Sequence, residues 1–147
     1  MPYGGNDWLD ITKEDIIEPS LPICDPHHHY WDLRVERTPY AKYLLHELLD
    51  DISGHNITST VFIEARAMYN ADIEKDFKPV GEVEFVEGIS AASASGIYGK
   101  SRASASIIGH ANLNLGNRVE PILQSLLEAS PRRFKGIRHI VAWDTDK

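Results

Sequence analysis

Short apolar segments alternate with segments of helical periodicity along most of this chain, and no other feature constrains its fold more. Residues 58–65 (Thr-Ser-Thr-Val-Phe-Ile-Glu-Ala) are β-branched and apolar enough for a buried strand. Residues 119–127 carry apolar side chains at the i, i+3, i+4, i+7, i+8 spacing of an amphipathic helix. The other expected elements are strands at 21–24, 103–113 and 134–143 and helices at 40–52 and 83–94. This order predicts an α/β protein with a parallel sheet.

Composition limits the classes of partner. A chain of 147 residues is long enough for one domain with a core, expected at 21–147 after a polar leader at 1–20. Its net charge of −7 argues against nucleic acid or an anionic membrane and favours a small-molecule substrate. No signal peptide or membrane-spanning stretch is evident, so a cytoplasmic location is expected. The single cysteine, Cys24, is expected to be a small buried hydrophobe.

Three histidines follow the first expected strand, within Pro-Ile-Cys-Asp-Pro-His-His-His-Tyr-Trp-Asp at residues 22–32. In extended backbone His27 and His29 project to one side, whereas His28 points to the other and is expected to be structural. Neutral imidazole is the commonest side-chain ligand of zinc and related divalent ions. The spacing therefore predicts a two-ligand grip on a divalent metal.

Two other interpretations of the histidine cluster stay open. It could be a solvated structural loop, or it could have only adventitious affinity for metals. Under the metal interpretation, Asp25 and Asp32 are candidates to fix the imidazole tautomers.

Each expected strand has a polar or ionisable residue at its carboxyl end. These residues are His27 and His29, then Glu64, then His110, then Arg138 and His139. In a parallel sheet, and above all in a (β/α)₈ barrel, the active site is assembled at that end. No glycine-rich nucleotide motif follows any strand, which argues against a dinucleotide or nucleotide fold.

The ordered set of motifs resembles one known family. Residues 25–32 (Asp-x-His-x-His-Tyr-Trp-Asp) resemble the first-strand motif of the amidohydrolase superfamily, in its amidohydrolase-related branch (amidohydrolase family 2) of TIM-barrel metal-dependent hydrolases and lactonases. Segments similar to the following strands, helix and loop are found at 61–65, 84–88 with 94–99, 108–113 and 134–139. The resemblance covers nearly the whole chain from residue 21.

This resemblance implies a fold and a size. Members of the family close eight strands into a barrel, with further metal ligands and the catalytic aspartate on later strands. The chain would then be the first half of a TIM (β/α)₈ barrel, with about four strands, and Lys147 is expected to be a truncation point. A half barrel leaves two open parallel edges, which invite pairing with a second copy, so a homo-oligomer is possible.

The resemblance also implies a chemistry. His27 and His29 would ligate zinc or manganese, and the ion would activate water for addition to a lactone or amide. Some lactonase relatives work with little or no metal. The catalytic residue is unknown, because the base belongs to the second half of the barrel, so the isolated chain is expected to be inactive.

Three more side chains are candidates for substrate binding. Arg138 resembles the arginine that grips a substrate carboxylate, with a salt bridge or surface charge as the alternative. Glu64 could be a ligand, a substrate contact or a buried carboxylate satisfied by a neighbouring strand, and His110 a site residue or a satisfied core histidine. The acid-rich residues 81–87 are expected to be a solvated helix start.

Two functions follow from these expectations. The first is an N-terminal fragment of a metal-dependent hydrolase, a lactonase or related C–O or C–N hydrolase acting on small carboxylated or sugar-derived substrates. The second is a non-catalytic half-barrel protein that binds metal or associates with itself.

Overall fold

The computed structural model of this chain describes residues 11–34 and 40–142. Its strands are β1 (Ile23–His28), β2 (Ile57–Ile63), β3 (Arg102–Gly109) and β4 (Phe134–Ile137). Its helices are α2 (Leu45–Asp51), α3 (Val80–Ala94) and α4 (Glu120–Ala129), with 3₁₀ turns at Lys75–Phe77 and Leu113–Val119. No helix of these ranges is both long and apolar enough to cross a membrane.

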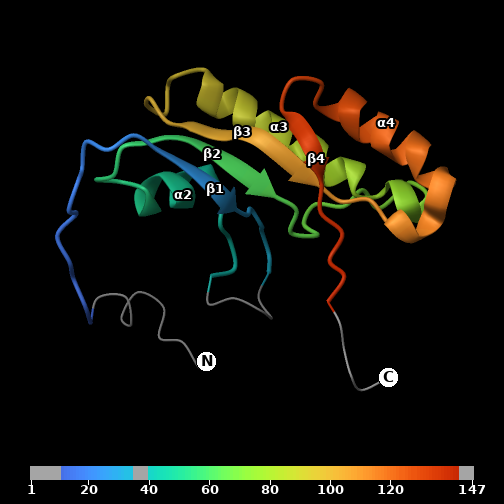
Figure 1. Cartoon of the computed structure of the whole chain (residues 1–147), viewed down its shortest axis with the longest axis horizontal. Coiled ribbons are helices and arrows are strands. Elements are labelled where there is room, and N and C mark those ends of the chain that lie inside the picture. Colours follow the sequence, from blue (N-terminus) through green and yellow to red (C-terminus); the bar gives the residue numbers. More distant parts are fainter. Residues whose placement is uncertain (1–10, 35–39, 143–147) are drawn as a thin grey trace.

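The four strands form one all-parallel sheet in the order β1-β2-β3-β4, which confirms the predicted α/β class. Neighbours in the sheet are also neighbours in the chain, so the strand order does not reverse. Helices α3 and α4 contact each other along the sheet, and α2 lies beside β1 and β2 (Figure 1). All the carboxyl strand ends consequently meet at one edge, called here the carboxyl edge.

Several element boundaries differ from those expected. The helix expected at 40–52 begins only at Leu45, because the backbone of Tyr43 is bridged to that of Trp31 by hydrogen bonds of 2.8 and 2.9 Å. The strand expected at 134–143 ends at Ile137, because the Arg138 carbonyl accepts a hydrogen bond from the His110 ring instead of a strand. Residues 1–10 of the expected leader and 143–147 of the last expected strand lie outside the described residues.

One hydrophobic core fills the space between the sheet and its helices. Ile122 and Leu126 of α4 are buried in it, as their periodicity predicts. Its other large members are Tyr30, Leu45, Leu48, Phe62, Val83, Val86, Ile107 and Phe134. This side of the sheet is called here the covered face.

His28 lies on the covered face, as the alternation along β1 predicts. It is only 7% exposed, and its Nε2 atom is 2.8 Å from Thr60 Oγ1 and 3.3 Å from Ser104 Oγ. Burial lowers the pKa of His28 to about 4, so the ring is neutral at neutral pH. Cys24 was expected to be buried and is exposed instead.

Candidate functional site

The five side chains predicted for the site all lie at the carboxyl edge. His27 is the penultimate residue of β1 and His29 follows that strand directly. Glu64, His110 and Arg138 each follow the last residue of β2, β3 and β4. The parallel topology therefore gathers residues that are more than 100 positions apart in the sequence.

The rings of His27 and His29 converge on one point. Their Nε2 atoms are 3.2 Å apart, and the two rings meet edge to face with centroids 4.9 Å apart. Two imidazole nitrogens bound to one tetrahedral zinc lie about 3.3 Å apart, given Zn–N bonds of about 2.0–2.1 Å. The distance between the two Nε2 atoms fits a shared divalent ion.

A backbone carbonyl fixes the tautomer of His29. The Nδ1 atom lies 2.8 Å from the carbonyl oxygen of Ile63, which can only accept, so Nδ1 carries the proton and donates it. In the neutral ring Nε2 then has a free lone pair, which is the arrangement seen in metal-binding histidines. Burial lowers the pKa of His29, which favours this neutral form. Without metal, His27 Nε2–H donates to the same lone pair.

The described residues supply two ligands to such an ion but not a third. Within residues 11–34 and 40–142, no three His, Cys, Asp or Glu side chains are grouped so that they could hold a metal. Asp25, which flanks the histidines, accepts a 3.0 Å hydrogen bond from the backbone N–H of His27 instead of one from an imidazole. Among the described residues, His27 and His29 are therefore the two side chains placed to hold a metal together.

Glu64 and Arg138 form an ion pair at the edge. Arg138 Nε and Nη2 each lie 2.9 Å from Glu64 Oε1, and Nη2 also donates to the Glu64 backbone carbonyl at 2.7 Å. Glu64 is 1% exposed, so Arg138 balances a buried carboxylate. A substrate carboxylate that used the same nitrogens would have to compete with Glu64. Both charges also act on His29, since Arg138 lowers and Glu64 raises its pKa.

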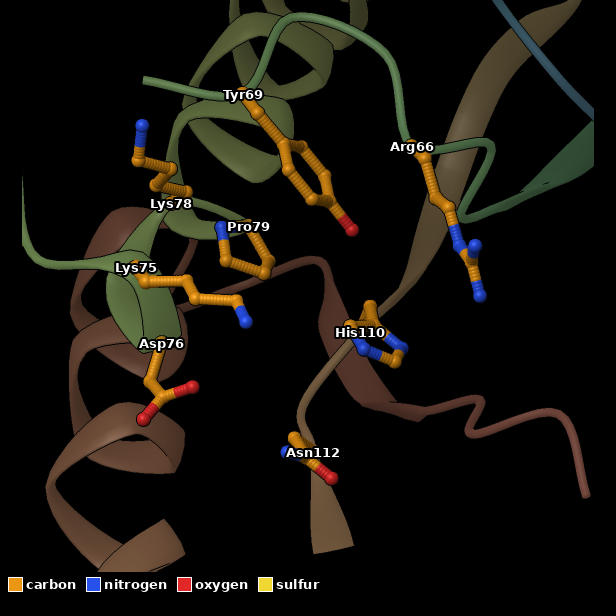
Figure 2. A pocket seen from close by; sticks show the side chains of 8 residues that line it. All are labelled: Arg66, Tyr69, Lys75, Asp76, Lys78, Pro79, His110 and Asn112. Carbon is orange, nitrogen blue, oxygen red and sulfur yellow. The ribbon is translucent and has the colours of Figure 1, made fainter. Parts of the chain in front are cut away.

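His110 is tied to the last strand. Its Nδ1 donates to the backbone carbonyl of Arg138 at 2.9 Å, and its ring lies edge to face with that of His139, with centroids 5.5 Å apart. On its other side His110 borders a cavity of about 370 Å³ (Figure 2). His110 thus joins the backbone after β4 to the wall of that cavity.

Glu82 is a buried acid that sequence reasoning missed. It belongs to residues 81–87, which were expected to be solvated, yet its exposure is 0%. Its Oε1 atom accepts hydrogen bonds from the backbone N–H groups of Ala65 (3.0 Å) and Ala67 (2.8 Å), which holds the segment after β2 against α3. Burial raises the pKa of Glu82 to about 7, and the charge of Glu64 adds to the rise.

One local signal could have placed Glu82 correctly. Pro79 is the N-cap of α3, and proline is typical of the start of a helix. Starting the helix there puts Glu82 one position before Val83 and four before Val86, beside the side chains that face the core. The partners of Glu82 are backbone groups of a loop, which carry no sequence signal.

Comparison with protein-family models, with curated proteins and with solved structures finds no match for this chain.

Proposed function

We propose that this chain is the N-terminal part of a metal-dependent hydrolase of the amidohydrolase-related family. The observation that carries the proposal is the convergence of His27 and His29, whose Nε2 atoms are 3.2 Å apart. Its second support is the bond from His29 Nδ1 to the Ile63 carbonyl, which turns the lone pair of Nε2 towards His27. A solvated loop would need neither arrangement.

The sheet supports the proposal that its four units are the first half of a (β/α)₈ barrel. In a barrel, consecutive strands are neighbours throughout, whereas a doubly wound sheet reverses its strand order at a switch point. The observed order β1-β2-β3-β4 follows the barrel rule. The contact between α3 and α4 agrees with it, since successive crossovers of one hand place their helices on the same side.

The proposed reaction is hydrolysis of a lactone or related small ester or amide. Water adds to the carbonyl carbon and the C–O or C–N bond breaks, so that a lactone opens to a single hydroxy acid, whereas an open-chain ester or amide gives a carboxylic acid and an alcohol or amine. A bound divalent ion would supply Lewis-acid polarisation of the carbonyl and acidification of the water. His27 and His29 would hold the ion, the Ile63 carbonyl would orient His29, and the ion pair of Glu64 with Arg138 would border the substrate.

Zinc binding tests the metal assignment. Calorimetric titration should give one zinc ion per chain, and His27→Ala or His29→Ala should weaken that binding. Loss of an outer partner of a ligand alone costs roughly 10–100-fold in metal affinity, so loss of a ligand should cost at least as much. His55→Ala, at an exposed position before β2, is the matched control. Equal zinc affinity in all four proteins would sink the assignment.

The unpaired sheet edges favour a second candidate function, a non-catalytic half-barrel protein that associates with itself. Within the described ranges β1 pairs only with β2, and β4 only with β3. Beyond β4 the side chains of Ile140 and Val141 are 55% and 84% exposed. Open edges of this kind are templates for pairing with another copy.

Native mass and turnover separate the two functions. Sedimentation equilibrium of the 16.5 kDa chain should show a stable dimer, without turnover of a panel of lactones, if self-association is the function. A monomer that joins a separately supplied second half and then hydrolyses a lactone would favour the hydrolase.

A further inference from the structure

The cavity beside His110 carries an excess of positive charge. Its walls bring together Arg66 from the segment after β2 and Lys75 and Lys78 from the segment before α3, with Asp76 as the acid among the lining residues (Figure 2). Behind the wall, burial raises the pKa of the Tyr69 hydroxyl, and the charges of Glu82 and Glu64 add to the rise. The whole chain has a net charge of −7, so a concentration of cationic side chains around one hollow is unlike its average surface.

Packing against α3 positions this cavity. The Glu82 carboxylate holds the backbone of Ala65 and Ala67 on either side of Arg66. Arg66 itself has a φ of +57°, a left-handed conformation that is uncommon for a residue with a side chain. Such strain concentrates at ligand-binding positions, where the surrounding structure enforces it. The backbone conformation of Arg66 is therefore fixed by the hydrogen bonds of its neighbours Ala65 and Ala67 to Glu82, and it is not the conformation that an unconstrained loop would favour.

Three donors at the cavity are available to a ligand. In the part of the chain that the structure describes, the side chains of Arg66 and Lys75 make no hydrogen bond or ion pair with protein groups. The Tyr69 hydroxyl is buried, has no partner among the described residues and points into the space between Pro79 and Arg66 (Figure 2). Lys78 is different, since its Nζ donates to the Ala71 carbonyl at 3.1 Å.

The start of α3 adds to the positive potential. Val80, its first residue, follows Pro79, which lines the cavity, so the amino end of a 15-residue helix lies at the wall. The N–H groups of Gly81 and Glu82 already donate to the carbonyls of Lys78 and Pro79, at 3.2 Å each, so the helix attracts an anion here through its macrodipole. Charge, a buried hydroxyl and a helix terminus therefore all favour the same kind of ligand.

We propose that this cavity binds an anionic group of the substrate, a carboxylate or a phosphate, with Arg66 and Lys75 as its counter-charges and the Tyr69 hydroxyl as a donor. The inference rests on the proposed hydrolase function and sharpens its substrate class to molecules that carry an oxyanion. It assigns the anion to this cavity because Arg138, at the same edge, is engaged by Glu64. Arginine suits the task because its planar fork matches two oxygens of an oxyanion.

Titration with two simple anions tests the site in the full 147-residue chain without zinc. Inorganic phosphate and succinate, each matched for ionic strength with sodium chloride, would be followed by two-dimensional amide NMR. Amide signals of residues 66–69, 75–78, 80 and 110–112 should shift with at least one of the anions. A response to phosphate alone identifies a phosphorylated substrate, and a response to succinate alone a carboxylated one.

Charge-removing variants make the test specific. Arg66→Gln and Lys75→Gln should each weaken anion binding by at least about tenfold, since a hydrogen bond to a charged group contributes about 1.5–3 kcal/mol. Lys100→Gln, at an exposed position before β3 and so at the opposite edge of the sheet, should leave binding unchanged. The amide spectrum of each variant also verifies that it is folded, and Tyr69→Phe gives a second, smaller loss.

Two results would overturn the inference: no shift at the cavity with either anion, or equal weakening by Lys100→Gln and Arg66→Gln. The zinc titration is independent of this experiment. Zinc binding without anion binding would leave the hydrolase proposal standing and remove the anion site. Anion binding without zinc binding would keep an anion site and contradict the metal-dependent hydrolase on which its substrate role rests.

Discussion

Histidine has a different environment on the covered face from the one it has at the carboxyl edge. On the covered face His28 is buried beside Thr60, Ser104 and the ring of Phe62, and its pKa is lowered to about 4. One residue away, at the edge, His29 is half-buried and keeps a lone pair directed at His27. Their separation follows from the alternation of side chains along a strand.

This difference between the two regions separates the residues that stabilise the fold from those that are placed to bind a ligand. Apolar burial, the main stabilising contribution in folding, is concentrated on the covered face. The edge carries the converging imidazoles, and it carries the Tyr69 hydroxyl and a Glu64 oxygen, which have no hydrogen-bond partner among the described residues. Substitutions on the covered face should therefore change the free energy of unfolding, and exposed substitutions at the edge should change binding.

The largest expected effect is on the covered face. Phe62 is fully buried and stacks on Tyr30 with ring centroids 5.7 Å apart. Phe62→Ala should lower the free energy of unfolding by about 3–5 kcal/mol, because it leaves a cavity in a packed core. Val141→Ala, at a side chain that is 84% exposed, should change it by less than about 0.5 kcal/mol. Urea unfolding measures the free energy of unfolding of both variants. Equal losses in the two would contradict the claim that stability comes chiefly from the covered face.

A pH effect of intermediate size is expected where the two regions meet, at Glu82. Its carboxyl has a pKa of about 7 in the fold against 4.5 as the ordinary value, chiefly because it is buried. The folded state holds this proton more tightly, so the contribution of Glu82 to stability is fully present below pH 4.5 and is lost as the pH rises from 4.5 to about 7. The loss between these limits is roughly 3 kcal/mol at about 1.4 kcal/mol per pKa unit.

Glu82→Gln removes this titration and can still accept the hydrogen bonds from Ala65 and Ala67. Urea unfolding at pH 5 and pH 8 should therefore show a smaller loss of stability for Glu82→Gln than for the unsubstituted protein. Glu84→Gln, an exposed position on the same helix, should keep the original pH dependence. Parallel profiles for all three proteins would mean that Glu82 does not titrate as a buried acid.

The smallest expected effects come from two glycines of α3. A Cβ atom at Gly81 would lie 2.7 Å from Asn70 N and 2.9 Å from Met68 O, so Gly81→Ala should destabilise by about 1–3 kcal/mol. No atom lies within 4 Å of a Cβ at Gly88, so Gly88→Ala should stabilise by about 0.5–1 kcal/mol through helix propensity. Thermal unfolding should show opposite shifts, and shifts of the same sign would mean that the edge segment does not pack on α3.

Most of the fold could be predicted from the periodicity of residues within single segments. The strand and helix order, the parallel sheet and the burial of Ile122 and Leu126 follow from patterns within single segments. The side-by-side arrangement of His27 and His29 is also local, because it depends on an i, i+2 spacing. The secondary structure of a segment, and the side to which its residues point, can be predicted from the residues of that segment alone.

Contacts between segments that are far apart in the sequence could not be predicted from such local patterns. The late start of α2 depends on the bridge between Trp31 and Tyr43, and the burial of Glu82 depends on backbone groups near Ala65. The cationic cavity joins Arg66 and Lys75 to His110, and nothing in their spacing signals a common site. The exposure of Cys24 likewise did not follow from the apolar residues around it in the sequence.

The most direct test of the central claim is the nitrogen NMR of the histidine rings during zinc titration. Before zinc, His29 should be the Nδ1–H tautomer, as its bond to Ile63 requires. With one equivalent of zinc, the Nε2 signals of His27 and His29 should shift together to metal-bound values, while that of His55 stays in place. An Nε2–H tautomer for His29, or zinc shifts of equal size at His55, would contradict a metal grip at this edge.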